Sequence, residues 1–150
     1  MEYLPGTIGV IYPTFEEYPN RCNKQEVVVY IPSNPDFSYR ASDVMSYYSD
    51  KKIDSLLIVN PDNPSGNFIP YTELLSLCEW AGFRSIRLIV DESFVDFAED
   101  GLNSSLLYNE ILEQYPHLVV MKSISKSYGV PGLRLGVLAS SDKSLVAFLK

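Results

Sequence analysis

Residues 118–129, with the sequence LVVMKSISKSYG, place a lysine between serines directly after an apolar run. The first four residues are apolar and rich in β-formers, so they predict a buried strand that ends just before Lys126. A lysine amine that is desolvated near a second cation, here Arg134, loses its proton more readily and becomes a nucleophile. Lysine, hydroxyls and arginine together would suit an aldehyde that carries a phosphate. The alternative reading is a solvated Lys-Ser loop between two strands.

Outward from this stretch, apolar strand patterns alternate with helical patterns along the whole chain. This alternation predicts an α/β fold, in which a mostly parallel sheet has helices on both faces in three αβα layers. The connection between the last two strands is too short for a helical crossover, so we expect the last strand to be antiparallel. The predicted strands cover residues 8–12, 26–31, 55–60, 87–92, 118–122 and 133–139. The predicted helices cover residues 14–23, 42–48, 71–82, 103–114 and 142–150, with Thr14 capping the first and Gly82 ending the third.

Composition narrows the class of protein. The 150 residues are 46% hydrophobic and 21% charged, which is typical of one globular domain. The net charge is −7 and no basic stripe is visible, which argues against a nucleic-acid partner. No signal peptide is visible, and no apolar run reaches the ~18–20 residues of a membrane span, so we expect a cytoplasmic protein without membrane contact. Cys22 and Cys78 are read as buried free thiols, and the single histidine, His117, makes a metal site improbable.

Chemically distinctive residues follow four of the predicted strands. Phe15 comes after the first strand, Asn63 after the third, Asp91 at the end of the fourth and Lys126 after the fifth. In open α/β sheets, ligands bind beyond the carboxyl ends of the strands. The sequence therefore predicts that these four residues belong to one site.

Four segments carry a family resemblance. They are residues 13–18 (PTFEEY), 60–66 (NPDNPSG), 90–97 (VDESFVDF) and 123–136 (SISKSYGVPGLRLG). In order and spacing they resemble the cofactor-stacking loop, the Asn-Pro turn, the Asp-Glu segment and the Schiff-base lysine signature of pyridoxal-phosphate aminotransferases of classes I and II. The branch that looks most similar contains the histidinol-phosphate aminotransferases and threonine-phosphate decarboxylases. Together these motifs are far more specific than any one alone.

The resemblance implies a role for each residue that follows a strand. Lys126 would form an imine with the aldehyde of pyridoxal phosphate and later shuttle a proton. Asp91 would pair with the pyridinium nitrogen, which keeps the ring an electron acceptor. Asn63 would donate a hydrogen bond to the ring oxygen, and Phe15 would stack on the ring face. Three of these residues also have a structural interpretation. Asn63 could be a turn residue, Asp91 an acid at a strand end, and Phe15 a core aromatic.

Two further features of the implied site are its phosphate-binding residues and one departure from the family pattern, at Phe94. Ser123 and Arg134 would hold the phosphate, with Ser125 as a weaker candidate. Many relatives carry a tyrosine at the position of Phe94, and its hydroxyl also bonds the ring oxygen. Phe94 cannot donate this bond, so the ring oxygen would rest on Asn63 alone. Phenylalanine here is similar to what decarboxylase-type relatives carry.

The resemblance also implies what lies outside this sequence. Residues 1–150 are similar to the central part of a large domain, without the family's N-terminal segment and C-terminal small domain. We expect a homodimer that acts on a small amino acid or amino phosphate. A decarboxylase or lyase with the same cofactor and a catalytically silent assembly module remain open. A dinucleotide-binding fold is disfavoured, because no G-x-G-x-x-G follows the first predicted strand.

Overall fold

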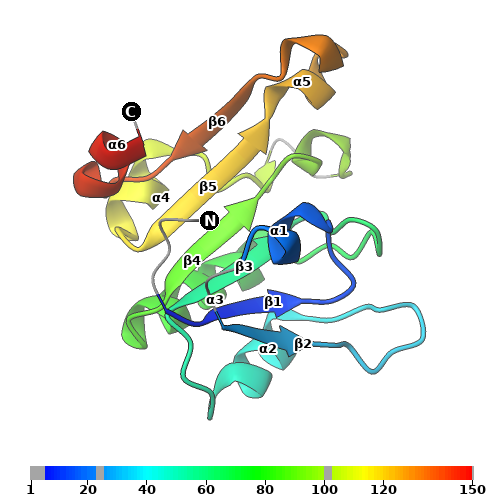
Figure 1. The fold of residues 1–150 in the computed structure, drawn as a ribbon, viewed down its shortest axis with the longest axis vertical. Helices are drawn as coiled ribbons and strands as arrows, with labels where there is room; N and C mark the ends of the chain where they lie inside the picture. The colour runs from blue at the N-terminus through cyan, green and yellow to red at the C-terminus, as the bar shows by residue number, and fades with distance from the viewer. Residues whose placement is uncertain (1–5, 23–25, 100–102, 150) are drawn as a thin grey trace.

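The computed structural model describes residues 6–22, 26–99 and 103–149, which form one six-stranded sheet (Figure 1). The strands are β1 (Ile8–Ile11), β2 (Val27–Tyr30), β3 (Ser55–Val59), β4 (Arg87–Asp91), β5 (Leu118–Ser123) and β6 (Gly136–Ala139). Across the sheet their order is β2-β1-β3-β4-β5-β6. Every neighbouring pair is parallel except β5 and β6, so the mostly parallel sheet with an antiparallel last strand is confirmed.

Helices cover both faces of the sheet, which confirms the three-layer arrangement. On one face lie α2 (Ala41–Tyr48), α3 (Tyr71–Phe83) and α4 (Asn109–Gln114), which pack against the larger hydrophobic core. On the other face, α1 (Glu17–Asn20) and α6 (Lys143–Leu149) accompany a smaller core (Figure 1). Successive strand residues point to opposite faces, so Leu56 and Ile58 enter the larger core and Leu57 the smaller one. All five residues of β3 are buried, as expected for a strand that is covered on both sides.

The first helix is shorter than the sequence predicted. It begins at Glu17, and Thr14 does not cap it. Proline fits a helix only in the first turn, where its missing N–H is not needed. A helix that began at Thr14 would place Pro19 in its second turn, so the later start is favoured. The predicted end of this helix, at Asn23, lies outside the described residues.

Two further helix boundaries also differ from the sequence prediction. α4 begins at Asn109 instead of Asn103, because the backbone N–H of Leu106 is bound by the Glu92 carboxylate. α3 continues through Gly82 to Phe83. Gly82 is needed for close approach, since a Cβ there would lie 2.7 Å from the His117 ring.

The last strand begins at Gly136 instead of Leu133. Pro131–Leu133 form a 3-10 turn, η3, and Arg134 adopts a left-handed backbone conformation with φ of 51°. These backbone angles do not fit a strand, so extended structure starts only after them. The turn matters for the site, because it determines where the Arg134 side chain lies.

The two cysteines are buried and free, as predicted. Cys78 lies in α3 within the larger core, and burial raises the pKa of its thiol to about 12. Within the described ranges no group of three or more His, Cys, Asp or Glu side chains could hold a metal ion. The helices of the same ranges are all too short or too polar to cross a membrane.

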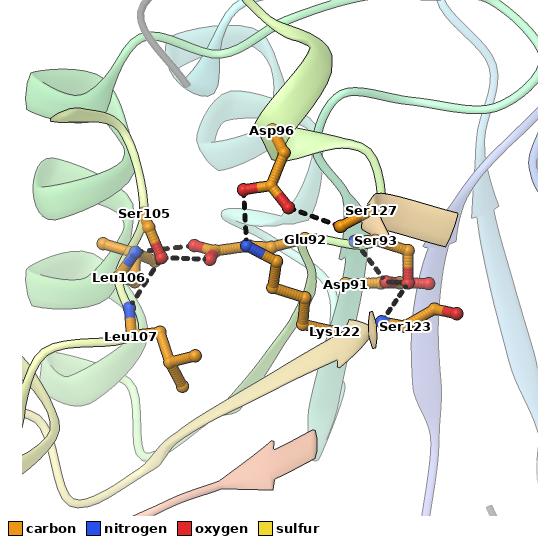
Figure 2. Close-up of polar contacts among 10 residues, drawn as sticks. All are labelled: Asp91, Glu92, Ser93, Asp96, Ser105, Leu106, Leu107, Lys122, Ser123 and Ser127. Carbon is orange, nitrogen blue, oxygen red and sulfur yellow. Dashed lines mark hydrogen bonds and ion pairs between the residues drawn. The ribbon is translucent and has the colours of Figure 1, made fainter. Parts of the chain in front are cut away.

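Glu92, the residue after β4, is fully buried on the face of the sheet opposite to Asp91. Its side chain links the segment between β4 and α4 to the sheet. Its carboxylate accepts hydrogen bonds from the Ser105 hydroxyl and the Leu106 N–H, each at 2.6 Å (Figure 2). Burial raises the pKa of this carboxyl. An acid with a raised folded pKa stabilises the fold most at low pH, and this contribution is lost as the pH rises through the folded pKa.

Glu92→Gln is therefore expected to gain stability relative to the wild-type protein as the pH rises. Glutamine keeps an acceptor for the Leu106 N–H and cannot ionise, so the cost of burying a charge disappears. Urea unfolding at about pH 4 and about pH 8 measures the difference. Glu113→Gln, an exposed glutamate on α4, is the control. An equal pH trend in both variants would contradict the role of Glu92 burial.

Candidate active site

A pocket of about 600 Å³ lies beyond the carboxyl ends of β1, β3, β4 and β5. Its size is within the usual range for small-molecule sites. It collects the four residues that follow predicted strands, together with the others that the family resemblance implied for the site. These residues are Phe15, Asn63, Asp91, Phe94, Ser123, Ser125, Lys126 and Arg134. Parallel strands explain the convergence, because their carboxyl ends meet at one edge of the sheet.

Asp91 ends β4 and is only 7% exposed, yet both of its carboxylate oxygens have partners. The Tyr18 hydroxyl donates to Oδ2, and the N–H and hydroxyl of Ser93 donate to Oδ1. The Ser93 oxygen in turn accepts the Ser123 N–H at 3.0 Å, which links β4 to β5 (Figure 2). All these donors are neutral, so the carboxylate is held in place without an ion pair among the described residues.

No role was predicted from the sequence for Tyr18 or Ser93. Burial, and then the charge of Asp91, raise the pKa of Tyr18 far above its usual range, so its hydroxyl remains a donor. The local signals existed, since Tyr18 lies only three residues after Phe15 in the same segment. Ser93 follows Asp91 by two residues, a spacing at which an aspartate often bonds the backbone.

Lys126 lies on α5 (Ile124–Ser127), a single turn that follows β5 directly. Its amine is 3.8 Å from the centre of the Phe94 ring and 6.0 Å from that of Phe15. The sequence predicted a desolvated lysine. This prediction is wrong for the part of the chain that the structure describes, because the Lys126 side chain is exposed. The reason is its position at the rim of the sheet, beside residues 128–138, which are exposed themselves. The alternative of a solvated Lys-Ser loop is right about solvation, since Lys126 is exposed, but α5 is a helical turn and its lysine faces an aromatic ring.

Ser123 and Arg134 offer polar groups at the same end of the pocket. Neither the Ser123 hydroxyl nor the Arg134 guanidinium has a hydrogen-bond partner within residues 6–22, 26–99 and 103–149. Ser125 differs, because its hydroxyl accepts the Leu135 N–H at 2.8 Å and donates to the Leu135 carbonyl at 3.2 Å. These bonds tie α5 to the start of the antiparallel hairpin. The structure therefore gives Ser125 a structural task and leaves its hydroxyl no proton for a ligand.

The donor set matches the chemistry of pyridoxal phosphate. Asp91 supplies a carboxylate at the inner end, Lys126 an amine at the rim, and Ser123 with Arg134 a hydroxyl and a guanidinium that suit a phosphate. Phe15 is an exposed aromatic residue with its ring edge-on to Tyr18, 5.8 Å between centroids, so a ring face remains for stacking. The residues present therefore fit this cofactor, although the role of each remains a prediction.

Comparison with known proteins agrees with this chemistry. The family described as aminotransferase class I and II matches residues 5–150. The L-serine phosphate decarboxylase of Sulfurospirillum multivorans is 31% identical, and the match covers 95% of this chain and 37% of that protein. The histidinol-phosphate aminotransferase of Candida maltosa is 35% identical over 87% of this chain and 34% of that protein. Among solved structures, the histidinol-phosphate aminotransferase from Clostridium acetobutylicum gives a TM-score of 0.80 at 26% identity, over 95% of this chain and 41% of that one.

The chain belongs to the aminotransferase class I and II family. Membership confirms the family expected from the sequence motifs, together with pyridoxal phosphate as the family's cofactor. The chain spans between about one third and two fifths of the length of the relatives above. The activity, substrate and assembly of the whole protein are therefore matters for proposal.

Proposed function

We propose that the protein containing this chain is a pyridoxal-phosphate-dependent aminotransferase, which acts on an amino acid or amino phosphate through Lys126. The observation that carries the proposal is the convergence of the Lys126 amine, the Asp91 carboxylate and the Asn63 amide on one pocket. Bound pyridoxal phosphate supplies an aldehyde and a ring that accepts electrons. Residues 1–150 would be the central part of its cofactor-binding large domain.

Each residue of the site would have a role that follows from its position in the pocket. Asp91, fixed by Tyr18 and Ser93, holds a negative charge at the inner end and favours a protonated ring nitrogen there. Lys126 at the rim supplies the nucleophilic amine and afterwards a base that moves a proton. Ser123 and Arg134 bind the phosphate and so fix the ring between the two ends.

A decarboxylase is the second candidate, and Phe94 favours it. The residue borders the pocket beside Lys126 and has no hydroxyl to donate to a ring oxygen. One relative is an L-serine phosphate decarboxylase. The full-length protein, mixed with candidate amino acids and amino phosphates, distinguishes the two reactions. Transamination converts the bound cofactor to pyridoxamine phosphate, whereas decarboxylation releases carbon dioxide.

Cofactor capture by the full-length protein tests the proposal directly. Adding pyridoxal phosphate is expected to give the absorption band of the lysine-bound cofactor, and borohydride should then fix the cofactor onto Lys126. Peptide mapping by mass spectrometry identifies the modified lysine. Absence of the band, or modification at a different lysine, would contradict the proposal.

The 150-residue chain alone is expected to bind pyridoxal phosphate weakly or not at all. The physical reason is the exposure of Lys126 and Arg134, which leaves the rim of the pocket open to water that competes for their charges. Titration of the chain and of the full-length protein, monitored by the same absorption band, compares the two. Tight stoichiometric binding by the chain alone would contradict this expectation.

Assembly and location belong to the same proposal. A homodimer is expected from the family resemblance, and a cytoplasmic location is expected because no apolar run of the sequence reaches the length of a membrane span. Support comes from exposed apolar side chains around the hairpin, including Tyr128, Leu133 and Leu135, which would be covered in a larger assembly. Sedimentation of the full-length protein measures its oligomeric state.

A further inference from the structure

Asp96 joins three segments around the lysine that the proposed function uses. It lies in the 3-10 turn η1 (Val95–Phe97), two residues after Phe94. One carboxylate oxygen pairs with the Lys122 amine at 2.6 Å, and the other accepts the Ser127 hydroxyl (Figure 2). Lys122 belongs to β5, and Ser127 is the neighbour of Lys126 on α5. A single side chain therefore connects η1 both with β5, which precedes Lys126, and with α5, on which Lys126 lies.

This contact is better formed than an ordinary surface ion pair. The Lys122 side chain is 19% exposed and that of Asp96 28% exposed, so water screens the pair only partly. Hydrogen bonds from Lys122 and then Ser127 hold the pKa of Asp96 below its usual range. The carboxylate therefore remains ionised at neutral pH, with a cation and a hydroxyl bound to opposite oxygens.

The hairpin holds α5 through backbone hydrogen bonds, because the N–H groups of Ile124 and Ser125 donate to the Leu135 carbonyl and the Val130 N–H donates to the Ser125 carbonyl. α5 is a single turn, and the exposed Lys126 side chain touches the Phe94 ring. On one side, Ser125 fastens α5 to the hairpin through Leu135. On the side of Phe94, the Ser127–Asp96 hydrogen bond is the polar link between α5 and η1. Loss of this link would let α5 move relative to the ring that the lysine faces.

We propose that Asp96 is a positioning residue for Lys126, which fixes the spacing between η1 and α5 and so holds the amine over the Phe94 ring. The inference rests on the proposed function, since it assigns Asp96 to the step in which Lys126 captures pyridoxal phosphate. Asp96 itself does not line the pocket. It acts through Ser127 on the lysine and through the chain of η1 on Phe94.

The test measures how fast the full-length protein captures pyridoxal phosphate, from the growth of the lysine-bound absorption band. Asp96→Ala removes both contacts and is expected to slow capture about 10-fold or more, because a small displacement of a reacting group lowers rates steeply. Ser127→Ala removes only the link to α5 and should slow capture in the same direction. Asp96→Glu, which can bind both partners again, should restore most of the rate. The circular dichroism of the bound cofactor should weaken in Asp96→Ala and recover in Asp96→Glu.

Asp142→Ala is the matched control. Asp142 also bridges a cation, Arg87 at 2.9 Å, and a serine hydroxyl, Ser144, with a similarly exposed side chain. It does not line the pocket. The control should lose thermal stability as Asp96→Ala does, yet capture the cofactor at the wild-type rate. An Asp96→Ala protein that captures the cofactor as fast as this control would overturn the inference, as would a wild-type rate in Ser127→Ala.

The wild-type protein, run in parallel, separates the two possible failures. If it does not form the band on Lys126, the proposed function itself fails. If it does, and the Asp96 and Ser127 variants match it in rate and dichroism, only the positioning role fails.

Discussion

Replacing Lys126 by alanine in the full-length protein is expected to abolish the lysine-bound absorption band and lower turnover by about 10⁴-fold. The amine is the nucleophile that captures the aldehyde, and the same group moves a proton afterwards, a contribution that alone reaches about 10⁴ in rate. Alanine keeps the helical turn of α5, so the remaining pocket should fold as before. Absorption after addition of pyridoxal phosphate and steady-state kinetics measure the two effects.

Lys51→Ala is the matched control for this substitution. Its amine lies 4.1 Å from the centre of the Tyr47 ring, so it shares the lysine-over-ring geometry of Lys126 but does not line the pocket. The control should retain the band and the turnover. Persistence of the band in Lys126→Ala would show that another amine captures the cofactor, and the site assignment would be wrong.

Asp91→Asn is expected to lower turnover by about 10²–10³-fold while the band still forms. Asparagine keeps the size of the side chain and removes the negative charge that favours a protonated ring nitrogen, an electrostatic loss of about this magnitude. Lys126 is unchanged, so capture itself should survive. Tyr18→Phe, which removes one donor to Asp91 and leaves the charge, should have a much smaller effect.

Asp62→Asn is the control for loss of a buried carboxylate. Asp62 is 6% exposed, accepts the Ser65 hydroxyl, and lies in the turn beside Asn63 without lining the pocket. It should affect stability more than turnover. Equal losses of turnover in Asp91→Asn and Asp62→Asn would mean that the charge of Asp91 has no special task.

Sequence patterns predicted the sheet and the membership of the pocket because both depend on strand order. The strands predicted at residues 55–60, 87–92 and 118–122 are parallel neighbours in the sheet, and parallel strands bring their carboxyl ends to one edge. The role of Tyr18 was not predicted, because a hydrogen bond between residues as distant in sequence as Tyr18 and Asp91 depends on side-chain direction. Periodicity does not encode that direction.

The helix ends were missed for a different physical reason. Local propensity favoured a helix from Asn103, but the Leu106 N–H found a better partner in a buried carboxylate of another segment. The same kind of competition placed Gly82 inside α3, where the His117 ring leaves no room for a side chain. Tertiary contacts of this kind override propensity and are visible only once the chain is folded.

The two ends of the pocket differ in conformational freedom, and this difference sets an order of events. Both oxygens of Asp91 are already hydrogen-bonded, so its side chain is fixed before a ligand arrives. Binding at that end therefore costs no side-chain entropy of Asp91. Lys126 is exposed and touches an aromatic ring, so its long side chain keeps rotamers that must be given up on capture. Docking against the rigid end would therefore come first, and covalent closure by the flexible end would follow as a separate, slower phase.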